Sequence, residues 1–369
     1  MSRRLVLTAF PTPRLRSLLS GPREFDAGVS RCIGRFALGR AAIYWAFRGL
    51  GIKRGSTAWL PDYHCGVEVQ AAIDAGMDVQ YYRISRDLTI DEEDLRMRVR
   101  ARPGPVLIIH YFGFPQPQVR RIADTCAELG VTLIEDCAHA LFSSMGEIQL
   151  GSVARLAAFS LRKTLPVYDG ATLVLNHSQL DSPPRMRPSI NSYKLLLKDR
   201  VRSVLGPGFV QTLRDWCSAR EPPRPSQLEW EQQSGNYLQG HSMLSRRMAA
   251  AAVPAAIVAV RRRNWELVDA RLAAGGDHTP VWTKLPVGVC PLFYCLWSRT
   301  RDDTMRRLLG EGVETFRFGA RPHPSLDLSV HPAVANLRDN IVGFPIHQQL
   351  EPEALHRGLD VLARVAGTR

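Results

Sequence analysis

The sequence predicts an α/β protein: a large domain on a mostly parallel sheet, followed by a smaller α+β domain. Between about 40 and 176, apolar strand-like runs alternate with amphipathic helix-like runs, which is typical of βαβ units. After about 250 a long helix precedes a strand-like run and two further helices. A chain of 369 residues exceeds one typical domain. We therefore expect a large domain over 1–250 and a small C-terminal domain over 251–369.

Each expected element has its own signal in the sequence. Residues 1–35 carry three prolines and are expected to be irregular. Helices end at glycines or begin with acidic residues, and strands are short and apolar. The expected helices are 40–52, 66–76, 89–99 and 117–130, and the expected strands are 56–61, 77–84, 105–112, 131–136, 157–161 and 171–176.

The remaining third of the chain is less regular. Residues 180–245 are rich in proline and arginine and are expected to form a variable insertion. From 246 a long helix is expected to run through Arg261–Arg263. These three arginines are interpreted as a solvated helix face, with an anionic substrate site as the alternative. A strand over 291–298 and helices over 302–312 and 351–366 complete the small domain.

Composition limits the classes of partner and the compartment. The formal net charge of +13 suits anionic partners, but no nucleic-acid-binding motif is present, so no nucleic-acid partner is expected. The seven cysteines form no CxxC pair, which predicts reduced thiols and no metal site. The longest apolar run, 248–260, contains Pro254 and is too short to cross a bilayer. We expect a cytoplasmic protein without a transmembrane segment.

Acidic residues end one of the predicted strands. The run "VTLIED" brings Glu135 and Asp136 to its carboxyl end, and ligands bind at this edge of open α/β sheets. Asp136 is explained either as a helix cap or as a carboxylate that pairs with a cationic ring nitrogen. His139 follows in a turn of small residues.

A lysine between two strand-like runs suggests the cofactor. Pyridoxal phosphate (PLP) enzymes need a carboxylate at the ring nitrogen and a lysine that forms a Schiff base with the cofactor aldehyde. Lys163 stands three residues after Ser160, which can reach a phosphate, and seven before Gly170. A single lysine is ordinarily an exposed surface residue, but these neighbours favour the cofactor role.

A helix start earlier in the chain can hold the phosphate. Gly39 precedes the helix expected from Arg40, and backbone N–H groups at a helix N-terminus bind anions. Arg40 would add a positive charge, with a solvent-exposed side chain as the alternative. His110, at the end of another strand, is interpreted as a core hydrogen-bonding residue rather than a catalyst.

With these motifs the chain resembles the DegT/DnrJ/StrS family of sugar aminotransferases, which are fold-type I PLP enzymes. The matching stretches are "LGRAAIYWAFRGLGIKRGSTAWLPDYHC", "EDCAHA", the spacing from Lys163 to Gly170, and "GFPIHQQLEPEAL". The resemblance implies that Asp136 pairs with the ring nitrogen and that Lys163 carries the cofactor. It also implies that His139 lies near the ring hydroxyl and that Tyr63 or His64 stacks on the ring. A surface aromatic pair is the alternative for the last two.

The chain departs from the family pattern at several positions. The family's Ser-Gly-Thr at the phosphate turn is here Leu38, Gly39 and Arg40. The spacing from Ser160 to Lys163 is two residues shorter than usual. The family's Gly-x-Asn-x-Arg motif, which reaches the neighbouring subunit's cofactor, is not recognisable, and His241 in "LQGHSMLS" stands where it should lie.

The resemblance implies a homodimeric aminotransferase that moves an amino group from an amino acid, glutamate by analogy, to a nucleotide-linked ketosugar. Such reactions serve polysaccharide or natural-product biosynthesis. Two alternatives stay open. One is a different PLP reaction on the same scaffold, and the other is a non-catalytic member of the family.

Overall fold

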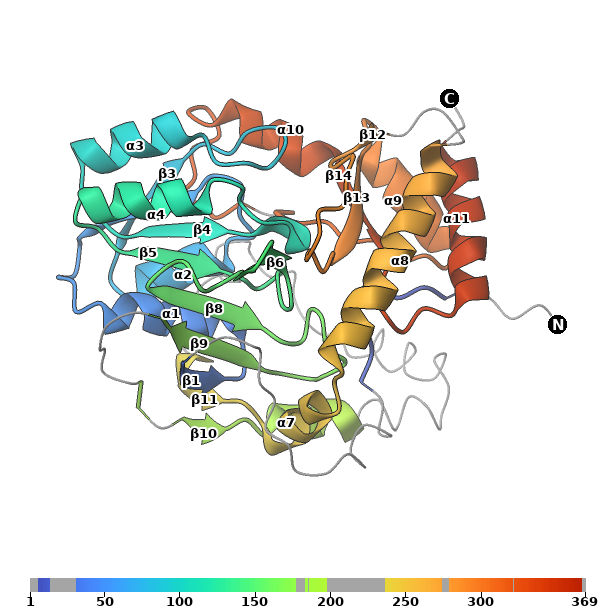
Figure 1. Cartoon of the computed structure of the whole chain (residues 1–369), viewed down its shortest axis with the longest axis horizontal. Coiled ribbons are helices and arrows are strands. Elements are labelled where there is room, and N and C mark those ends of the chain that lie inside the picture. The colour runs from blue at the N-terminus through green and yellow to red at the C-terminus, as the bar shows by residue number, and fades with distance from the viewer. Residues whose placement is uncertain are drawn as a thin grey trace, which may run out of the picture.

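The computed structural model describes residues 6–13, 31–176, 183–184, 186–197, 236–273, 279–320 and 322–366. Its main feature is a nine-stranded sheet with the order β10-β11-β1-β9-β8-β5-β4-β2-β3 (Figure 1). The strands are β1 (Cys32–Phe36), β2 (Thr57–Pro61), β3 (Asp78–Tyr82), β4 (Val106–Ile109), β5 (Leu133–Asp136), β8 (Leu156–Ser160), β9 (Ala171–Leu175), β10 (Arg187–Pro188) and β11 (Gln239–Gly240). Much of the expected 180–245 insertion, including 198–235, lies outside the described residues.

Five neighbouring strands of this sheet are parallel, which confirms the predicted fold class. β3, β2, β4, β5 and β8 pair in parallel, whereas β9 and β1 are antiparallel to their neighbours. All residues of β4 and β5 are buried, as expected for strands that are covered on both faces. The carboxyl ends of β4, β5 and β8 therefore meet at one edge of the sheet.

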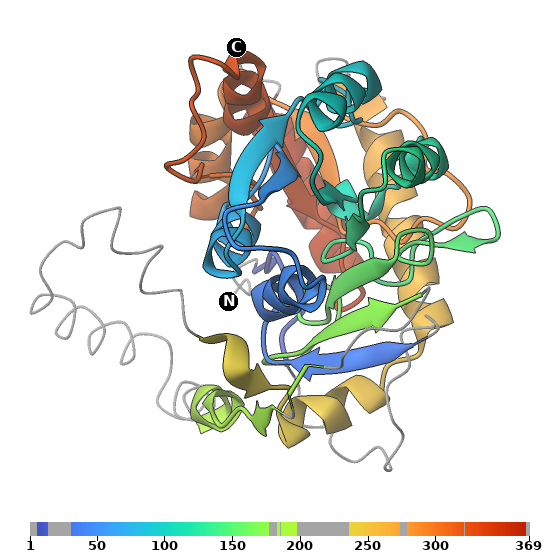
Figure 2. The ribbon, with the colours of Figure 1, turned by 90° about the vertical axis from the view of Figure 1, so that its left-hand side faces the viewer.

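Helices cover both faces of the sheet. Figure 2 shows α1 (Gly39–Gly49) on one side and α3 (Glu92–Ala101) and α4 (Val119–Glu128) on the other. α2 (Val67–Asp74) packs against α1. The predicted acidic start of α3 is present, because the Asp91 carboxylate accepts a hydrogen bond of 3.1 Å from the N–H of Asp94.

A second, antiparallel sheet forms near the C-terminus from β12 (Thr279–Pro280), β13 (Phe293–Trp297) and β14 (Ile341–Pro345). The helices in this part of the chain are α9 (Arg301–Gly310), α10 (Pro332–Asn340) and α11 (Pro352–Ala366). α9 and α11 pack with this sheet, whereas the buried apolar residues of α10 belong to the core of the large sheet. Leu7 joins the core of α9 and α11: it is fully buried, and its N–H donates to the carbonyl of Gly312 at 2.8 Å. The first described residues thus pack with the C-terminal elements, although the proposed boundary near 250 places them in the large domain.

Two expectations about elements are wrong. Residues 32–36 form β1 instead of an irregular segment, because they pair with β9, which lies far away in sequence. The expected long helix is two helices, α7 (Met243–Ala250) and α8 (Pro254–Ala273), bent by 74°. Pro254 begins α8 because a proline has no N–H to donate and its φ suits the first turn.

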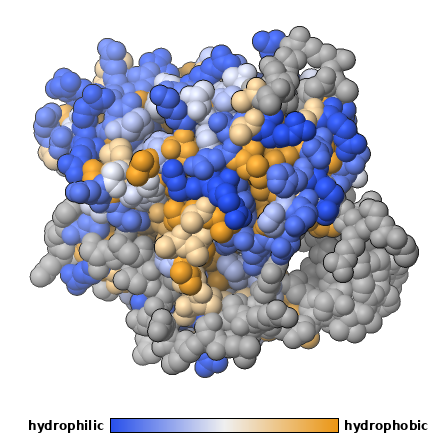
Figure 3. All heavy atoms as spheres, turned by 45° about the vertical axis from the view of Figure 1, so that its right-hand side comes forward, coloured by the Kyte–Doolittle hydropathy of each residue, from blue (hydrophilic) through white to orange (hydrophobic). Residues whose placement is uncertain are grey.

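Among the described helices, no single one is long and apolar enough to cross a membrane, although α7 and α8 together meet that test as a bent pair by length and composition. Figure 3 shows one face of the molecule, on which an irregular hydrophobic band lies between larger hydrophilic areas.

A short hairpin of β6 (Ser144–Met145) and β7 (Ile148–Gln149) follows β5.

Candidate active site

A pocket of about 160 Å³ opens where β4, β5 and β8 end and α1 begins. It therefore lies at the sheet edge that the sequence predicted. Six of the eight predicted site residues line it, namely Gly39, Arg40, Asp136, His139, Ser160 and Lys163. The other lining residues are Leu38, Ile43, Cys65, Val67, Glu68, Ile109, Ala138, Arg162 and Phe318.

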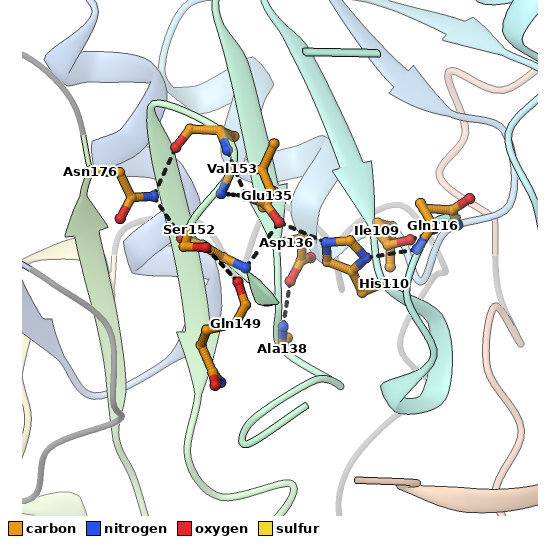
Figure 4. Close-up of polar contacts among 12 residues, drawn as sticks. Ile109, His110, Gln116, Glu135, Asp136, Ala138, Gln149, Ser152, Val153 and Asn176 are labelled. Atoms are coloured by element: carbon orange, nitrogen blue, oxygen red, sulfur yellow. Dashed lines mark hydrogen bonds and ion pairs between the residues drawn. The ribbon is translucent and has the colours of Figure 1, made fainter. Parts of the chain in front are cut away.

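Asp136 ends β5 and turns its carboxylate into this pocket. The side chain is buried, and one carboxylate oxygen accepts a hydrogen bond of 2.8 Å from the N–H of Ala138 (Figure 4). Burial raises the pKa of Asp136 to about 6, although the charge of nearby Lys163 acts in the opposite direction. A buried carboxylate with few donors is suited to a cationic partner that arrives with a ligand.

Glu135, one residue earlier, points away from the pocket, because successive side chains of a strand face opposite sides. Its carboxylate accepts hydrogen bonds from the backbone N–H groups of Gly151, Val153 and Ala154 at 2.7 to 2.9 Å and lies 2.8 Å from Nε2 of His110 (Figure 4). Burial alone would raise the pKa of Glu135, but the contact with His110 and the backbone donors lower it overall.

His110 belongs to the same network. It is fully buried, and its Nδ1 accepts a hydrogen bond of 3.0 Å from the N–H of Gln116. Nε2 therefore carries the proton that is shared with Glu135. This geometry agrees with the predicted role of His110 as a core hydrogen-bonding residue.

The N-terminus of α1 forms the second end of the pocket. Its N-cap, Leu38, makes no side-chain cap, and the first turn of α1 carries no acidic residue. The helix dipole at this end therefore favours an anion. Gly39 lies against the end of β8: a β-carbon at Gly39 would be 3.5 Å from Cβ of Ser160. Arg40 and Arg162 line the same pocket. This combination of helix end, hydroxyl and guanidinium groups can hold a phosphate.

Lys163 lies in a turn between β8 and β9. The turn is closed by hydrogen bonds from the N–H groups of Thr164 and Leu165 to the carbonyl of Leu161, at 3.1 and 2.7 Å. Gly170 ends the connection at φ +133°, where a β-carbon would lie only 2.8 Å from Nε2 of His241. The glycine predicted after the lysine is thus required both by its backbone conformation and by the space available.

His139 offers a hydrogen-bond donor to the pocket. Its Nδ1 accepts from the N–H of Phe112 at 3.2 Å, so Nε2 carries the proton, and this buried atom has no partner within the described residues. Burial, followed by the charge of Lys163, lowers the pKa of His139 well below its ordinary value. The ring is therefore a neutral donor at neutral pH.

Tyr63 and His64 are buried but are not among the residues that line the pocket. Tyr63 packs against Tyr111 and Phe318, and His64 stacks on Tyr81. Neither is a surface aromatic residue, so that alternative is wrong. Stacking of either ring on a cofactor stays a prediction that their positions do not favour.

Cys65, the next residue, does line the pocket together with Glu68. Its N–H and its thiol both donate to the Glu68 carboxylate at 2.8 Å. Desolvation and the charge of Glu68 raise the pKa of the Cys65 thiol, so it is not a nucleophile at neutral pH.

Among the nine other lining residues, Cys65, Glu68, Arg162 and Phe318 are the charged, thiol or aromatic ones that sequence reasoning did not assign to the site. Arg162 carried a signal, because it stands between Ser160 and Lys163 in a stretch already assigned to the cofactor. Phe318 carried none, since it comes from the C-terminal third and reaches the pocket only through tertiary packing. His241, the guess for the cross-subunit motif, is buried, and its Nε2 lies 3.8 Å from the Asp169 carboxylate.

The parallel sheet and the helices that cover it form the predicted fold, that of a fold-type I PLP-dependent transferase, and Asp136 and Lys163 lie at the carboxyl edge of its sheet. Residues 27–189 match the model of the DegT/DnrJ/EryC1/StrS aminotransferase family. The match covers less than half of the chain and confirms, over these residues, the resemblance drawn from the sequence. The matched range, 27–189, contains all eight predicted site residues.

Similar proteins come from several bacteria. A 171-residue segment, 45% of this chain and 45% of the relative, is 28% identical to UDP-4-amino-4,6-dideoxy-N-acetyl-beta-L-altrosamine transaminase of Campylobacter jejuni. A 141-residue segment is 26% identical to GDP-perosamine synthase of Vibrio cholerae, and it covers 37% of this chain and 38% of that relative. The matched segments thus span less than half the length of these curated relatives.

Solved structures resemble the fold over nearly the whole chain. Helicobacter pylori PseC, an aminotransferase involved in the biosynthesis of pseudoaminic acid, has a TM-score of 0.69 at 13% identity and covers 97% of this chain and 99% of its own. A DegT DnrJ EryC1 StrS aminotransferase from Brucella abortus has a TM-score of 0.64 at 18% identity, with 93% and 87% covered. At these identities the likeness concerns the fold.

Proposed function

We propose that this protein is a PLP-dependent aminotransferase that moves an amino group from an amino acid to a nucleotide-linked ketosugar, with glutamate as the expected donor. The observation that carries the proposal is the convergence of Asp136, Lys163 and Ser160 on one pocket at the carboxyl edge of the sheet. They come from the end of β5, the end of β8 and the turn after it, and each has a chemical type that PLP requires.

The residues that are present fit the cofactor. Asp136 is a buried carboxylate with an elevated pKa, which is the environment in which a cationic ring nitrogen is most stabilising. The unpartnered Nε2–H of His139 can donate to the ring oxygen. Gly39, Ser160 and the two arginines, Arg40 and Arg162, offer donors and positive charge for the phosphate. When bound, PLP supplies a reactive aldehyde and an electron-accepting ring.

The side chains of the chain have distinct tasks in this proposal. The Asp136 carboxylate holds the proton on the ring nitrogen, and His139 Nε2–H orients the ring. Lys163 Nζ would hold the cofactor and would be placed to carry a proton to and from a substrate carbon. Phe318 and Ile109 exclude water from the wall of the pocket.

The sugar substrate is supported by two observations. The first is that the two curated relatives described above are named for reactions that make nucleotide-linked aminosugars. The net charge of +13 favours a substrate that carries a diphosphate. Other PLP chemistry and a non-catalytic role are the alternatives, and the departure at Leu38, Gly39 and Arg40 is the feature that favours the second.

Borohydride reduction tests the proposal directly. Purified protein incubated with PLP is expected to develop a visible absorption band, to lose it on reduction, and to yield a peptide labelled at Lys163. Incubation with L-glutamate before reduction should remove the band and the label, because the amino group is then on the cofactor. A label on another lysine would contradict the assignment of Lys163, and a band insensitive to every amino acid would favour the non-catalytic alternative.

We also propose a cytoplasmic homodimer with the active site at the subunit interface, as the resemblance implies. Exposed apolar surface often marks where subunits meet, and Figure 3 shows such a band on one face. Sedimentation at several protein concentrations is expected to show a dimer that carries the activity. A fully active monomer would contradict this part of the proposal.

A further inference from the structure

Arg261 is the largest fully buried side chain among the described residues. It lies on α8, in the run that the sequence assigned to a solvated helix face, and that assignment is wrong for this residue. Its guanidinium donates to four neutral acceptors: Oε1 of Gln348 at 2.9 Å and the carbonyls of Leu292, Pro291 and Thr164 at 3.1, 3.2 and 3.3 Å. These acceptors belong to three segments that are far apart in sequence.

Three of the groups form a closed ring of hydrogen bonds. Arg261 Nε donates to Oε1 of Gln348, Nε2 of Gln348 donates to the carbonyl of Thr164 at 2.8 Å, and Arg261 Nη2 donates to the same carbonyl. The Gln348 amide therefore has a defined orientation. The carbonyl of Thr164 receives two donors from side chains that lie 87 residues apart in sequence.

The carbonyl of Thr164 lies next to the predicted cofactor-binding lysine, so the ring of hydrogen bonds acts on the backbone that carries Lys163. Thr164 follows Lys163 in the turn that presents the lysine to the pocket, and Thr164 itself is buried. The backbone around Thr164 is also held by its own two bonds to Leu161 and by the bond from the N–H of Leu161 to Gly170, and the end of the connection is held by bonds to Ala37 and Ser245. Arg261 and Gln348 thus provide the side-chain contacts that tie the peptide after Lys163 to α8 and to the segment after β14.

Stability alone is a weak reason for such an arrangement. No carboxylate pairs with Arg261 in the part of the chain that the structure describes, and a guanidinium buried with neutral acceptors loses its hydration without an opposite charge in return. Burial accordingly lowers the pKa of Arg261 to about 10. An apolar side chain of similar volume would fill the space, but it could not donate to three segments at once.

We propose that Arg261 and Gln348 are positioning residues, which fix the direction of the Lys163 side chain by holding the carbonyl of Thr164. The inference rests on the proposed role of Lys163. It assigns no contact with the substrate to either residue. Since both donors come from outside the large sheet, the position of the lysine depends on how α8 and the segment after β14 pack against that sheet.

The variant Gln348→Glu separates positioning from stability. A carboxylate still accepts from Arg261, and it even supplies the missing charge, but it cannot donate to Thr164. Gln349→Glu is the matched control. Gln349 is the next residue, and its amide also accepts one hydrogen bond and donates one, in this case from and to the backbone of Thr12. Arg261→Met is the second variant. Its control is Arg262→Met, since Arg262 donates to the carbonyls of Pro286 and Val289.

Two readouts are needed. The first is the rate at which acetic anhydride modifies Lys163 in the cofactor-free protein, relative to exposed Lys53 and measured by peptide mass spectrometry. The second readout is made on the PLP-loaded protein. It consists of the pH at which the visible absorption band is half-converted and the rate of the single-turnover reaction with L-glutamate. Gln348→Glu should remain folded by circular dichroism, change the acetylation ratio severalfold and shift the band. The rate should fall about 10–100-fold with little change in the half-saturating glutamate concentration.

The outcomes distinguish this inference from the proposed function. If wild-type protein binds no PLP but Gln348→Glu still alters the acetylation ratio, the proposed function fails and the positioning of Lys163 stands. If Gln348→Glu matches Gln349→Glu in acetylation ratio, pH midpoint and rate, the positioning role is overturned, whatever happens to the melting temperature. Arg261→Met should reproduce the changes of Gln348→Glu, and should it fail to fold, Gln348→Glu decides alone.

Discussion

Glu135 and Asp136 are neighbours at the end of β5, yet they occupy two different regions of the molecule. Glu135 faces the packed interior behind the pocket, where three backbone N–H groups and His110 surround its carboxylate. Asp136 faces the pocket, where a single backbone N–H donates to its carboxylate among the hydrogen bonds described. The pKa of Glu135 is lowered and that of Asp136 is raised to about 6.

The difference teaches which carboxylate is available for chemistry. The interior has already satisfied Glu135, so its charge stabilises the loop over residues 151–154 and cannot serve a ligand. Burial destabilises the ionised form of Asp136, and its few hydrogen bonds do not offset this free energy. A cationic ligand beside the carboxylate would stabilise the ionised form. Substitutions behind the pocket should therefore change stability, whereas substitutions in the pocket should change ligand binding and turnover.

The largest effect is expected for Asp136→Asn. A neutral amide leaves the ring nitrogen without a counter-charge, so the half-reaction with glutamate should slow by about 10³-fold. PLP should still bind, because the phosphate contacts remain. Stopped-flow absorbance measures the rate, and a variant that reacts as fast as the wild type would contradict the assigned role.

The matching change behind the pocket is Glu135→Gln. An amide can replace only part of the acceptor set, and its NH₂ group would face backbone N–H donors, so unfolding should become easier by about 3–5 kcal/mol. Urea denaturation of the cofactor-free protein measures this loss. If Glu135→Gln kept full stability but lost cofactor chemistry, the conclusion that Glu135 serves stability and Asp136 serves the ligand would be wrong.

The two carboxylates should also give opposite dependences of stability on pH. The pKa of Asp136 is raised from 3.8 to about 6, so its contribution is fully present below pH 4 and is lost as pH rises through 6. This rise corresponds to about 3 kcal/mol. Glu135 has a lowered pKa, and its contribution is lost on acidification instead.

Melting curves of the cofactor-free protein test this prediction between pH 4 and 8. Asp136→Asn should be more stable than the wild type above pH 6, and the gap should close toward pH 4. PLP should remove most of the gap, since the ring nitrogen then compensates the charge. Parallel curves for the two proteins would show that Asp136 does not titrate as described.

The smallest effects are expected at the phosphate end of the pocket. Arg40→Ala should weaken PLP binding by about 1.5–3 kcal/mol, the range for a hydrogen bond to a charged group. Arg162→Ala should have an effect of the same kind, because both side chains line this end. Titration with PLP gives the dissociation constants, and an unchanged value would exclude that arginine as a phosphate ligand.

Local patterns in the sequence predicted the α/β layers and the edge that carries the site. Alternating runs identify strands and helices, and parallel strands bring their carboxyl ends together, so Asp136, Ser160 and the turn of Lys163 were expected as neighbours. β1 was missed because its five residues contain Gly34 and Arg35 and become a strand only by pairing with β9. The burial of Arg261 and the arrival of Phe318 depend on contacts across more than 80 residues, which no local pattern encodes.

The packing of Leu7 has a consequence for the order of events during synthesis. This residue fits against Gly358, where a β-carbon would lie 2.2 Å from its Cδ1, and it exchanges backbone hydrogen bonds with Gly312 and Glu314. None of these partners exists until more than 300 further residues have been made. Leu7 therefore cannot dock before residues 312–358 have been made, and closing so long a loop makes its docking a late step of folding.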